Sequence, residues 1–465
     1  MLSGRPGRTG AARELDRRIA RLAIPALGSI AAEPLYTVAD TAIVGHLGRM
    51  PLDSLAIAAS TLMIVAWLSV FLSTATTSAV SRLMATRDDE AAGRAVGAAY
   101  LVAAALGLLM AAAVVLAAPP VAALLGARRG MLAGATGYLR ASAAGLPFLY
   151  LSFAGNGHLT GLEDTRTPLW IAAGANVVNV ALEAFLVFGA HAGLLGSAWG
   201  TVIAQVIAAA CYAVASWRGA RLRPRRPGAA EVRSLLRDGH RLSVRTIALG
   251  MVPLAAMATV ARLGPVALGG QQVAYRLWYL LSLSLDALAV PAQVYVSASI
   301  GARDPESART VGNRTLRIGL AAGIALGVVT AVLALGAPRL FTSDPAVQHD
   351  AVVGLVCSAF TQPAAATAFV LDGLILGITD YVAMRRAMII AIAAFLPVAA
   401  LVLRFHWLSL PGVWAALGLW LIARSALLGR RWAAYIRCAA AVPVSAGLPE
   451  AGPAGGLSKR GAVGR

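Results

Sequence analysis

Residues 85–97 read ATRDDEAAGRAVG, and residues 301–312 read GARDPESARTVG. Both segments are polar and rich in arginine, and both stand between long apolar stretches. Within them Arg87 matches Arg303, an offset of 216 residues. A single match of this kind carries little weight, so the offset has to recur elsewhere before it indicates a duplication.

The same offset recurs at two further places. Asp164 in GLEDTRTP matches Asp380 in LGITDYVA at 216 residues, and Trp199 in LGSAWG matches Trp414 in LPGVWA at 215. Each match falls at an equivalent loop or helix start. We therefore interpret the chain as two repeats of the same structural unit.

The composition places these repeats in a membrane. The chain has 465 residues, of which 58% are hydrophobic and 13% charged, and its mean hydropathy is +0.73. A soluble domain is about 45–50% apolar and about 25% charged. A spanning helix needs about 20 mostly apolar residues. Twelve candidates are centred near residues 34, 68, 107, 148, 179, 206, 252, 283, 326, 364, 395 and 420.

The predicted fold class is thus an all-α membrane protein with twelve transmembrane helices in two six-helix repeats. An even number of helices makes the repeats parallel, related by an axis along the membrane normal. The expected organisation is a basic N-terminal tail at 1–22, an N-terminal lobe at 23–217, an Arg-rich linker at 218–241, a C-terminal lobe at 242–432 and a disordered tail at 433–465.

Basic residues predict the orientation. The formal net charge is +19, nearly all of it from arginine, because Lys459 is the only lysine. The arginines lie between apolar stretches and on the tails, which argues against nucleic-acid binding. The positive-inside rule places both termini and the linker in the cytoplasm. The Arg- and Ala-rich composition is typical of a bacterial protein, so we expect a multi-pass protein of the bacterial inner (plasma) membrane, in contact with lipids and monomeric.

Motifs for other classes of function are missing from the sequence. It has no GxxxxGK[ST], HExxH or GxSxG, so we expect neither ATP hydrolysis nor an enzyme active site. Its cysteines, Cys211, Cys357 and Cys438, show no metal-ligand spacing. We predict no cofactor and no structural metal.

The first predicted span carries Glu33, Tyr36 and Asp40 at i, i+3 and i+7, which places them on one helical face. A charged group inside a bilayer is costly and usually faces a cavity. The same span contains Pro25 and Pro34, and proline removes a backbone hydrogen bond and permits a kink. These two prolines are candidate hinges.

A matching stripe occupies the fifth predicted span, where Asn176, Asn179 and Glu183 have the same spacing. Thr201, near the start of the sixth span, can complete a polar pocket shared with Asp40. An isolated asparagine is more often structural glue between helices. Two carboxylates on matching stripes favour a functional pocket instead.

The second repeat lacks this carboxylate pair, because apolar residues occupy the positions equivalent to Asp40 and Glu183. Its own charges include Arg245 and Asp286, which we interpret as a possible ion pair, structural or functional. Asp372 is equivalent to Asn156. The candidate residues for a substrate cavity are Glu33, Asn156, Asn176 and Asp372.

Four stretches carry a resemblance to a known family: IPALGSIAAEPLYTVADTAIVGHLG at 24–48, GLEDTRTP at 161–168, NVVNVALEAFLVFG at 176–189 and FVLDGLILGITD at 369–380. They resemble the multidrug and toxic compound extrusion (MATE) family, and specifically its DinF-like branch. The resemblance covers nearly all of the chain between the tails. It implies two six-helix lobes, alternating access, and export driven by inward movement of H⁺ or Na⁺.

The resemblance also implies a cation site in the N-terminal lobe, formed by Tyr36, Asp40, Asn179 and Thr201. The fifth-helix acid of the family is usually Asp, and here it is Glu183. Its extra methylene favours proton carriage over direct coordination of Na⁺. Two carboxylates in one poorly solvated pocket disfavour double ionisation, so we expect one of them to hold the coupling proton.

We therefore predict a cation-coupled antiporter that exports small cationic or neutral organic compounds, such as drugs or metabolites. One alternative is a flippase for lipid-linked precursors, which would need a cationic cavity for pyrophosphate. Another is a membrane-embedded enzyme or scaffold. An enzyme would be expected to show a dense cluster of histidines, acids or nucleophiles at a helix end.

Overall fold

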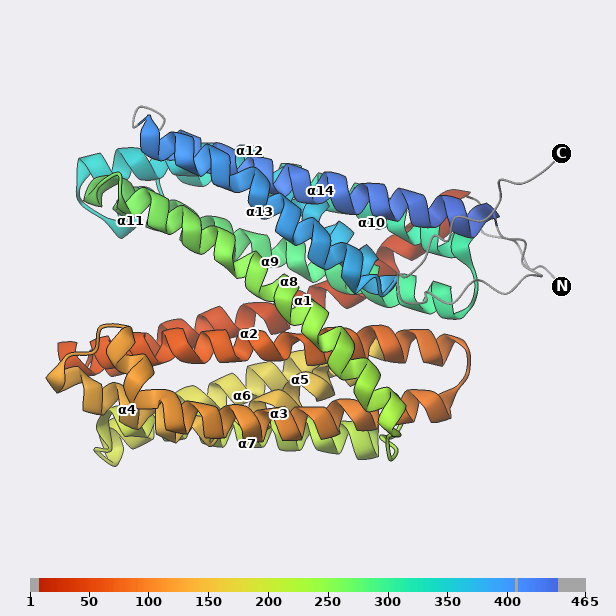
Figure 1. Ribbon diagram of the computed structural model, residues 1–465, viewed down its shortest axis with the longest axis horizontal. Helices are drawn as coiled ribbons and strands as arrows, with labels where there is room; N and C mark the ends of the chain where they lie inside the picture. Colours follow the sequence, from red (N-terminus) through yellow and green to blue (C-terminus); the bar gives the residue numbers. More distant parts are fainter. Residues whose placement is uncertain (1–7, 406–408, 442–465) are drawn as a thin grey trace, which may run out of the picture.

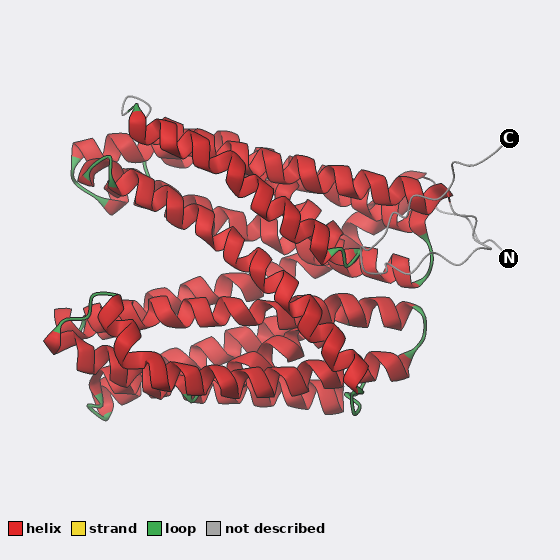
Figure 2. Cartoon of the chain, in the orientation of Figure 1, coloured by secondary structure: helices red, strands yellow, loops and turns green. Residues whose placement is uncertain are grey.

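The computed structural model describes residues 8–405 and 409–441, and all the regular secondary structure in these residues is helical (Figure 1, Figure 2). This confirms the predicted all-α fold class. The elements of the N-terminal half are α1 (Arg8–Gly45), α2 (Arg49–Ala85), α3 (Asp89–Leu124), α4 (Arg129–Ala143), α5 (Leu146–Gly161), α6 (Arg166–Ala184), η1 (Phe185–Gly189), α7 (Gly193–Val214) and η2 (Ala215–Gly219). Those of the C-terminal half are α8 (Ala229–Ala261), α9 (Pro265–Gly301), α10 (Pro305–Ala334), α11 (Pro338–Phe341), α12 (Pro345–Gly377), α13 (Tyr381–Arg404) and α14 (Ser409–Ala441).

One of the twelve predicted spans is broken. Within the described residues, 11 helices are long and apolar enough to cross a membrane. The span centred near residue 148 is instead divided between α4 and α5. Pro147 has no N–H to donate to the carbonyl of Ala143, so the helix is interrupted there. Both α4 and α5 pack against α2 and α3, so the two short helices occupy the place of one span beside them.

The duplication is visible in the backbone. Six residues with positive φ form three pairs, each 216 residues apart: Gly48 with Gly264, Arg87 with Arg303, and Glu163 with Thr379. These φ values lie in a region that residues other than glycine rarely adopt. The turns that end α1, α2 and α5 therefore have the same geometry as those that end α8, α9 and α12.

A pair of helix–helix hydrogen bonds repeats as well. Ser81 Oγ on α2 donates to the Gly161 carbonyl on α5 at 3.1 Å. In the second half, Ser297 Oγ on α9 donates to the Gly377 carbonyl on α12 at 3.0 Å. Helix packing is thus equivalent in the two halves, which confirms the two parallel repeats.

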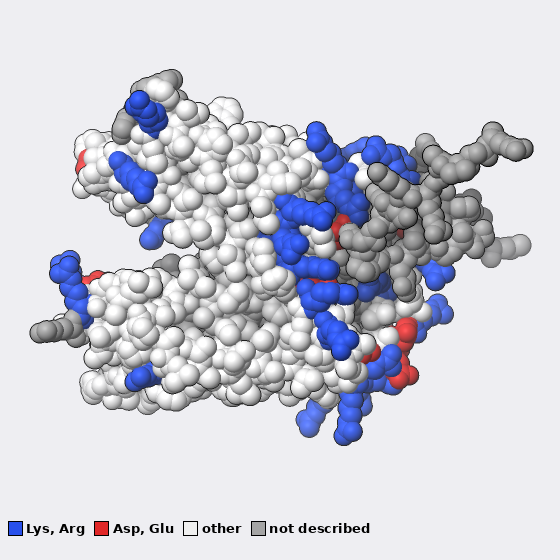
Figure 3. Space-filling view, in the orientation of Figure 1, with Lys and Arg blue, Asp and Glu red and all other residues white. Residues whose placement is uncertain are grey.

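The two lobes, α1–η2 and α8–α14, meet near the chain termini and diverge toward the opposite end (Figure 1). Ser78 Oγ on α2 donates to the Leu376 carbonyl at 3.0 Å. Gln293 Nε2 on α9 donates to the Thr74 carbonyl at 2.7 Å and to Ser78 Oγ at 2.8 Å. Figure 3 shows the surface hollowed between the lobes at the end away from the termini. The space between the lobes is therefore closed at the terminal end and open at the other.

Three predicted boundaries need correction, because helices continue beyond the apolar stretches. Helix α1 begins at Arg8, so residues 8–22 of the expected tail are helical up to and including Leu22, which is buried. Helix α8 begins at Ala229 and takes up the second half of the expected linker. Helix α14 reaches Ala441, so residues 433–441 are helical, whereas residues 442–465 of the expected disordered tail lie outside the described residues. Hydropathy marks only the apolar part of a helix, not the polar turns that extend it.

Basic side chains gather at the end of the molecule that carries the termini (Figure 3). This distribution agrees with the arginine pattern of the sequence. The assignment of that end to the cytoplasm stays a prediction.

Candidate functional site

The polar stripes of α1 and α6 meet inside the N-terminal lobe, where α7 completes a pocket. Tyr36 Oη and Thr201 Oγ1 share a hydrogen bond of 2.8 Å. One turn further along α1, Asp40 Oδ1 accepts a hydrogen bond of 2.8 Å from Ser197 Oγ. Asp40 is only 6% exposed. The predicted grouping of Tyr36, Asp40 and Thr201 thus corresponds to a contiguous set of contacts.

Glu183 lies in the same pocket and is fully buried. It interacts electrostatically with Asp40 and with the Ser197 hydroxyl. Helix α7 approaches closely here, because a Cβ at Gly200 would lie 3.1 Å from the Glu183 backbone. Among the described residues, neither Glu183 carboxylate oxygen has a hydrogen-bond partner at normal geometry, and neither has Asn179 Oδ1.

These unpartnered oxygens define what the pocket can hold. A buried oxygen acceptor without a donor is costly. A proton shared between two carboxyl groups removes part of that cost, and so does a hard cation that prefers oxygen ligands. The oxygen atoms of Asp40, Asn179, Glu183 and Thr201 are therefore suitable ligands for either H⁺ or Na⁺.

Two side chains of the pocket escaped sequence reasoning. Ser197 precedes Thr201 by one helical turn, so its i, i+4 spacing in α7 was the signal that could have found it. Tyr138 on α4 is buried and interacts with Asp40 and Ser197. It lies on α4, a separate short helix that the apolar pattern did not predict.

The remaining candidates on α1 and α6 have other surroundings. Asn176 Nδ2 donates to the Ala32 carbonyl of α1 at 2.8 Å, so it ties α6 to α1 instead of facing open space. Pro25 and Pro34 lie inside α1, which is helical through both. The side chain of Glu33 lies outside the described parts of the chain.

A separate cavity of about 180 Å³ lies between the lobes. Asn156 and Asp372, which occupy equivalent positions in the two repeats, both line it. Asn156 Nδ2 donates to Ser73 Oγ at 3.2 Å, and Thr160 Oγ1 donates to Asn156 Oδ1 at 3.3 Å. The substrate-cavity candidates Asn156 and Asp372 therefore lie together, apart from the pocket of Asp40 and Glu183.

The predicted ion pair of Arg245 with Asp286 is corrected by the structure. Arg245 forms its salt bridge with Asp372, whereas Asp286 lines the same cavity and interacts with Arg245 electrostatically without a salt bridge. A second arginine, Arg424 on α14, is fully buried and bonds the same carboxylate, with its Nε 3.3 Å from Asp372 Oδ1. Asp372 lies on α12, whose contacts with α8 and α14 are set by the tertiary fold and not by sequence spacing.

Sequence reasoning missed Arg424, although it lies only four residues from the centre of the predicted span near residue 420, and a charge at that depth was the signal that could have found it. Its burial changes the electrostatics of the central cavity. In the central cavity Asp372 and Asp286 lie in the field of two arginines, Arg245 and Arg424, whereas the carboxylates of the N-terminal pocket have no cationic partner among the described side chains. The acidic character expected of the cavity belongs to the N-terminal pocket alone.

Comparison with known proteins identifies relatives that are similar over most of the chain. A family model described as MatE matches residues 25–185 and 242–405, one stretch in each lobe. The chain is 30% identical to Protein DETOXIFICATION 44, chloroplastic, of Arabidopsis thaliana, over 88% of this chain and 81% of the relative. It is 24% identical to DNA damage-inducible protein F of Escherichia coli K12, over 91% of this chain and 93% of the relative.

Solved structures share the architecture. A crystal structure described as MATE in the bent conformation matches with a TM-score of 0.87 at 19% identity, over 92% of this chain and 96% of that chain. At this sequence identity the structural similarity establishes the fold alone.

Proposed function

The chain belongs to the MatE family of multidrug and toxic compound efflux transporters, and on this basis we propose that it exports small organic compounds in exchange for protons. One observation carries the proposal. Asp40 and Glu183 are two buried carboxyl groups in one pocket, with no cationic side chain to neutralise them among the described residues. Such a pair favours a bound proton, because two adjacent negative charges in a site of low polarity repel each other.

The proposed cycle alternates between two states of α1. Binding of a proton at Asp40 or Glu183 neutralises the pocket and lets α1 bend at Pro25 or Pro34. The bend alters the wall of the central cavity, because Ala26, Ser29 and Ile30 of α1 line it. Substrate is then held less tightly and leaves. A proton drives this change only if the two states differ in their affinity for it.

Sodium is the main rival as coupling ion. Asp40, Asn179, Glu183 and Thr201 offer carboxylate, amide and hydroxyl oxygens, the ligands that hard cations prefer. The longer side chain of Glu183 is the reason to propose the proton first.

For the substrate we propose cationic or neutral amphipathic compounds, because the acidic N-terminal pocket does not repel them as it would repel an anion. A flippase for lipid-linked precursors is the alternative that the central cavity raises, because Arg245 on its wall could meet a phosphate. The two carboxylates Asp372 and Asp286 already balance the two arginines Arg245 and Arg424, however, so the positive charge available to an anion is small.

Transport in inside-out membrane vesicles tests this function. We expect an imposed ΔpH to drive accumulation of a fluorescent organic cation by the wild type, and an imposed Na⁺ gradient at constant pH not to do so. Transport that needs Na⁺ and ignores ΔpH would replace the proton by sodium at the same pocket. The proposal of multidrug export fails if dyes, quinolones and metabolites all stay untransported under either gradient.

A further inference from the structure

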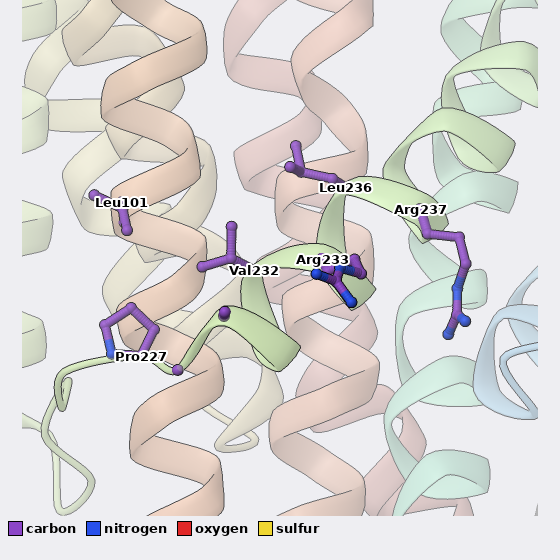
Figure 4. A pocket seen from close by; sticks show the side chains of 8 residues that line it. Leu101, Pro227, Val232, Arg233, Leu236 and Arg237 are labelled. Carbon is purple, nitrogen blue, oxygen red and sulfur yellow. The ribbon is translucent and has the colours of Figure 1, made fainter.

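A groove lies where the linker enters α8 (Figure 4), and it shares no lining residue with the central cavity. Its volume is about 640 Å³, and it is open at the surface. Helix α3, the end of the linker and the first turns of α8 form it. The lining residues are Leu101, Pro227, Gly228, Ala229, Val232, Arg233, Leu236 and Arg237.

The fold builds this groove by fastening the linker to α3. The Arg225 N–H donates to the Gly93 carbonyl of α3 at 2.9 Å. One turn further along α3, a Cβ at Gly97 would stand 1.8 Å from the Arg225 carbonyl oxygen, so only glycine permits the contact. The position of Pro227 and of the start of α8 beside α3 is therefore fixed by backbone contacts.

One side of the groove is apolar and faces outward. Leu101 is 53% exposed and Leu236 is 45% exposed, and Val232 lies between Leu101 and Arg233 in Figure 4. Leu101 lies three turns into α3, on a helix apolar enough to span the membrane. Exposed leucines on such a helix are the surface that acyl chains cover.

The other side of the groove is cationic, and few carboxylates lie near enough to neutralise its positive charge. Arg233 and Arg237 are one turn apart on α8, and both are exposed. Arg233 forms no ion pair with any residue that the structure describes. The Arg237 guanidinium lies 3.7 Å from Asp238, a carboxylate that is also 3.6 Å from Arg241. Two guanidinium groups one turn apart suit a phosphate group, which accepts charge-assisted hydrogen bonds from both.

We propose that this groove binds an anionic phospholipid, with an acyl chain along Leu101, Val232 and Leu236 and the phosphate between Arg233 and Arg237. Basic pockets at the cytoplasmic ends of membrane helices bind anionic headgroups in this way. The apolar wall favours a lipid over a free phosphate ion, because a phosphate ion gains no binding free energy from contact with leucine side chains. Helix α8 contacts α2 and α3 of one lobe and α13 and α14 of the other, so the bound lipid would lie against the helix that joins the lobes.

Native mass spectrometry of the purified full chain tests the proposal with phosphatidylglycerol and phosphatidylcholine of identical acyl chains. We expect the first phosphatidylglycerol to bind the wild type about tenfold more tightly than phosphatidylcholine, given two arginines at the headgroup. Arg233→Gln/Arg237→Gln should lose this preference. Arg385→Gln/Arg386→Gln removes the same charge from α13 and should keep it.

Two further measurements separate a lipid site from simple charge attraction. Leu236→Asn should weaken binding of phosphatidylglycerol although it leaves both arginines in place, and millimolar inorganic phosphate should not displace the lipid. Equal binding of the two lipids by the wild type would overturn the proposal. So would equal loss in the groove and α13 variants, no loss in Leu236→Asn, or displacement by phosphate.

Discussion

At the scale of single residues, the two lobes treat buried charge in opposite ways. In the C-terminal lobe Asp372 binds Arg245 and Arg424, these three side chains are largely removed from solvent, and Asp286 interacts electrostatically with both arginines. In the N-terminal lobe Asp40 and Glu183 face each other with hydroxyl groups and an amide around them. A matched cluster is stable only while every partner is present. An unmatched pair can gain a proton or a cation, which is the property that coupling needs.

The matched cluster gives a prediction about stability. Asp372→Asn leaves Arg245 and Arg424 without their shared carboxylate, and breaking a buried ion pair costs about 3–5 kcal/mol. We expect a clear fall in the apparent melting temperature of the detergent-purified protein. Asp53→Asn is the control, because Asp53 is exposed on α2 and forms no ion pair among the described residues, and it should shift the melting temperature much less. Equal stability of Asp372→Asn and the wild type would contradict the structural role of the cluster.

At the scale of the elements, sequence reasoning succeeded where the signals are local. Apolar length located the spans, and the polar turns at Arg87 and Arg303 and at Asp164 and Asp380 revealed the repeat. The structure shows why these turns match: Asp88 and Asp304, which follow the two arginines, cap the next helix by accepting a backbone N–H hydrogen bond at 2.9 Å. A helix cap depends on a few consecutive residues, so it remains recognisable in the sequence of both repeats.

Sequence reasoning failed where the outcome depends on tertiary contacts. Arg424 and Asp372 lie on different helices, and no spacing rule connects them. The break between α4 and α5 has a local cause in Pro147, but prolines are common in membrane helices and do not always interrupt them. The polar first turns of α8 were read as linker, because hydropathy does not distinguish a helix outside the bilayer from a loop.

The loops between elements provide a test of orientation. We propose that the linker is cytoplasmic and that the turn between α3 and α4 is outside, in keeping with the positive-inside rule. In a background without native cysteines, Arg128→Cys should react with an impermeant thiol reagent in intact cells, and Arg225→Cys should react only after the membrane is opened. Labelling of position 225 but not 128 in intact cells would reverse the proposed orientation.

At the scale of the whole molecule, the lobes are joined at the end that carries the termini. The N-terminal turns of α1 reach the other lobe, where the Asp16 carboxylate lies 2.5 Å from Arg314 of α10. Tyr295 of α9 donates to the Arg18 carbonyl at 3.2 Å. The central cavity is therefore closed on this side by contacts between lobes, and transport requires that they separate. In the proposed cycle, the state of Asp40 and Glu183 biases that separation through α1, the helix that reaches from the pocket to the opposite lobe.

The most direct test of this account is ΔpH-driven export in proteoliposomes that contain the wild type, Asp40→Asn, Glu183→Gln or the control Asp53→Asn, whose carboxylate is exposed on α2. Each protein is first shown to insert to the same amount. We predict that the wild type and Asp53→Asn export an organic cation at similar rates, and that Asp40→Asn and Glu183→Gln fall to the rate seen without a gradient. Full ΔpH-driven export by Asp40→Asn would contradict the central claim that the paired carboxyl groups of the N-terminal lobe carry the coupling proton.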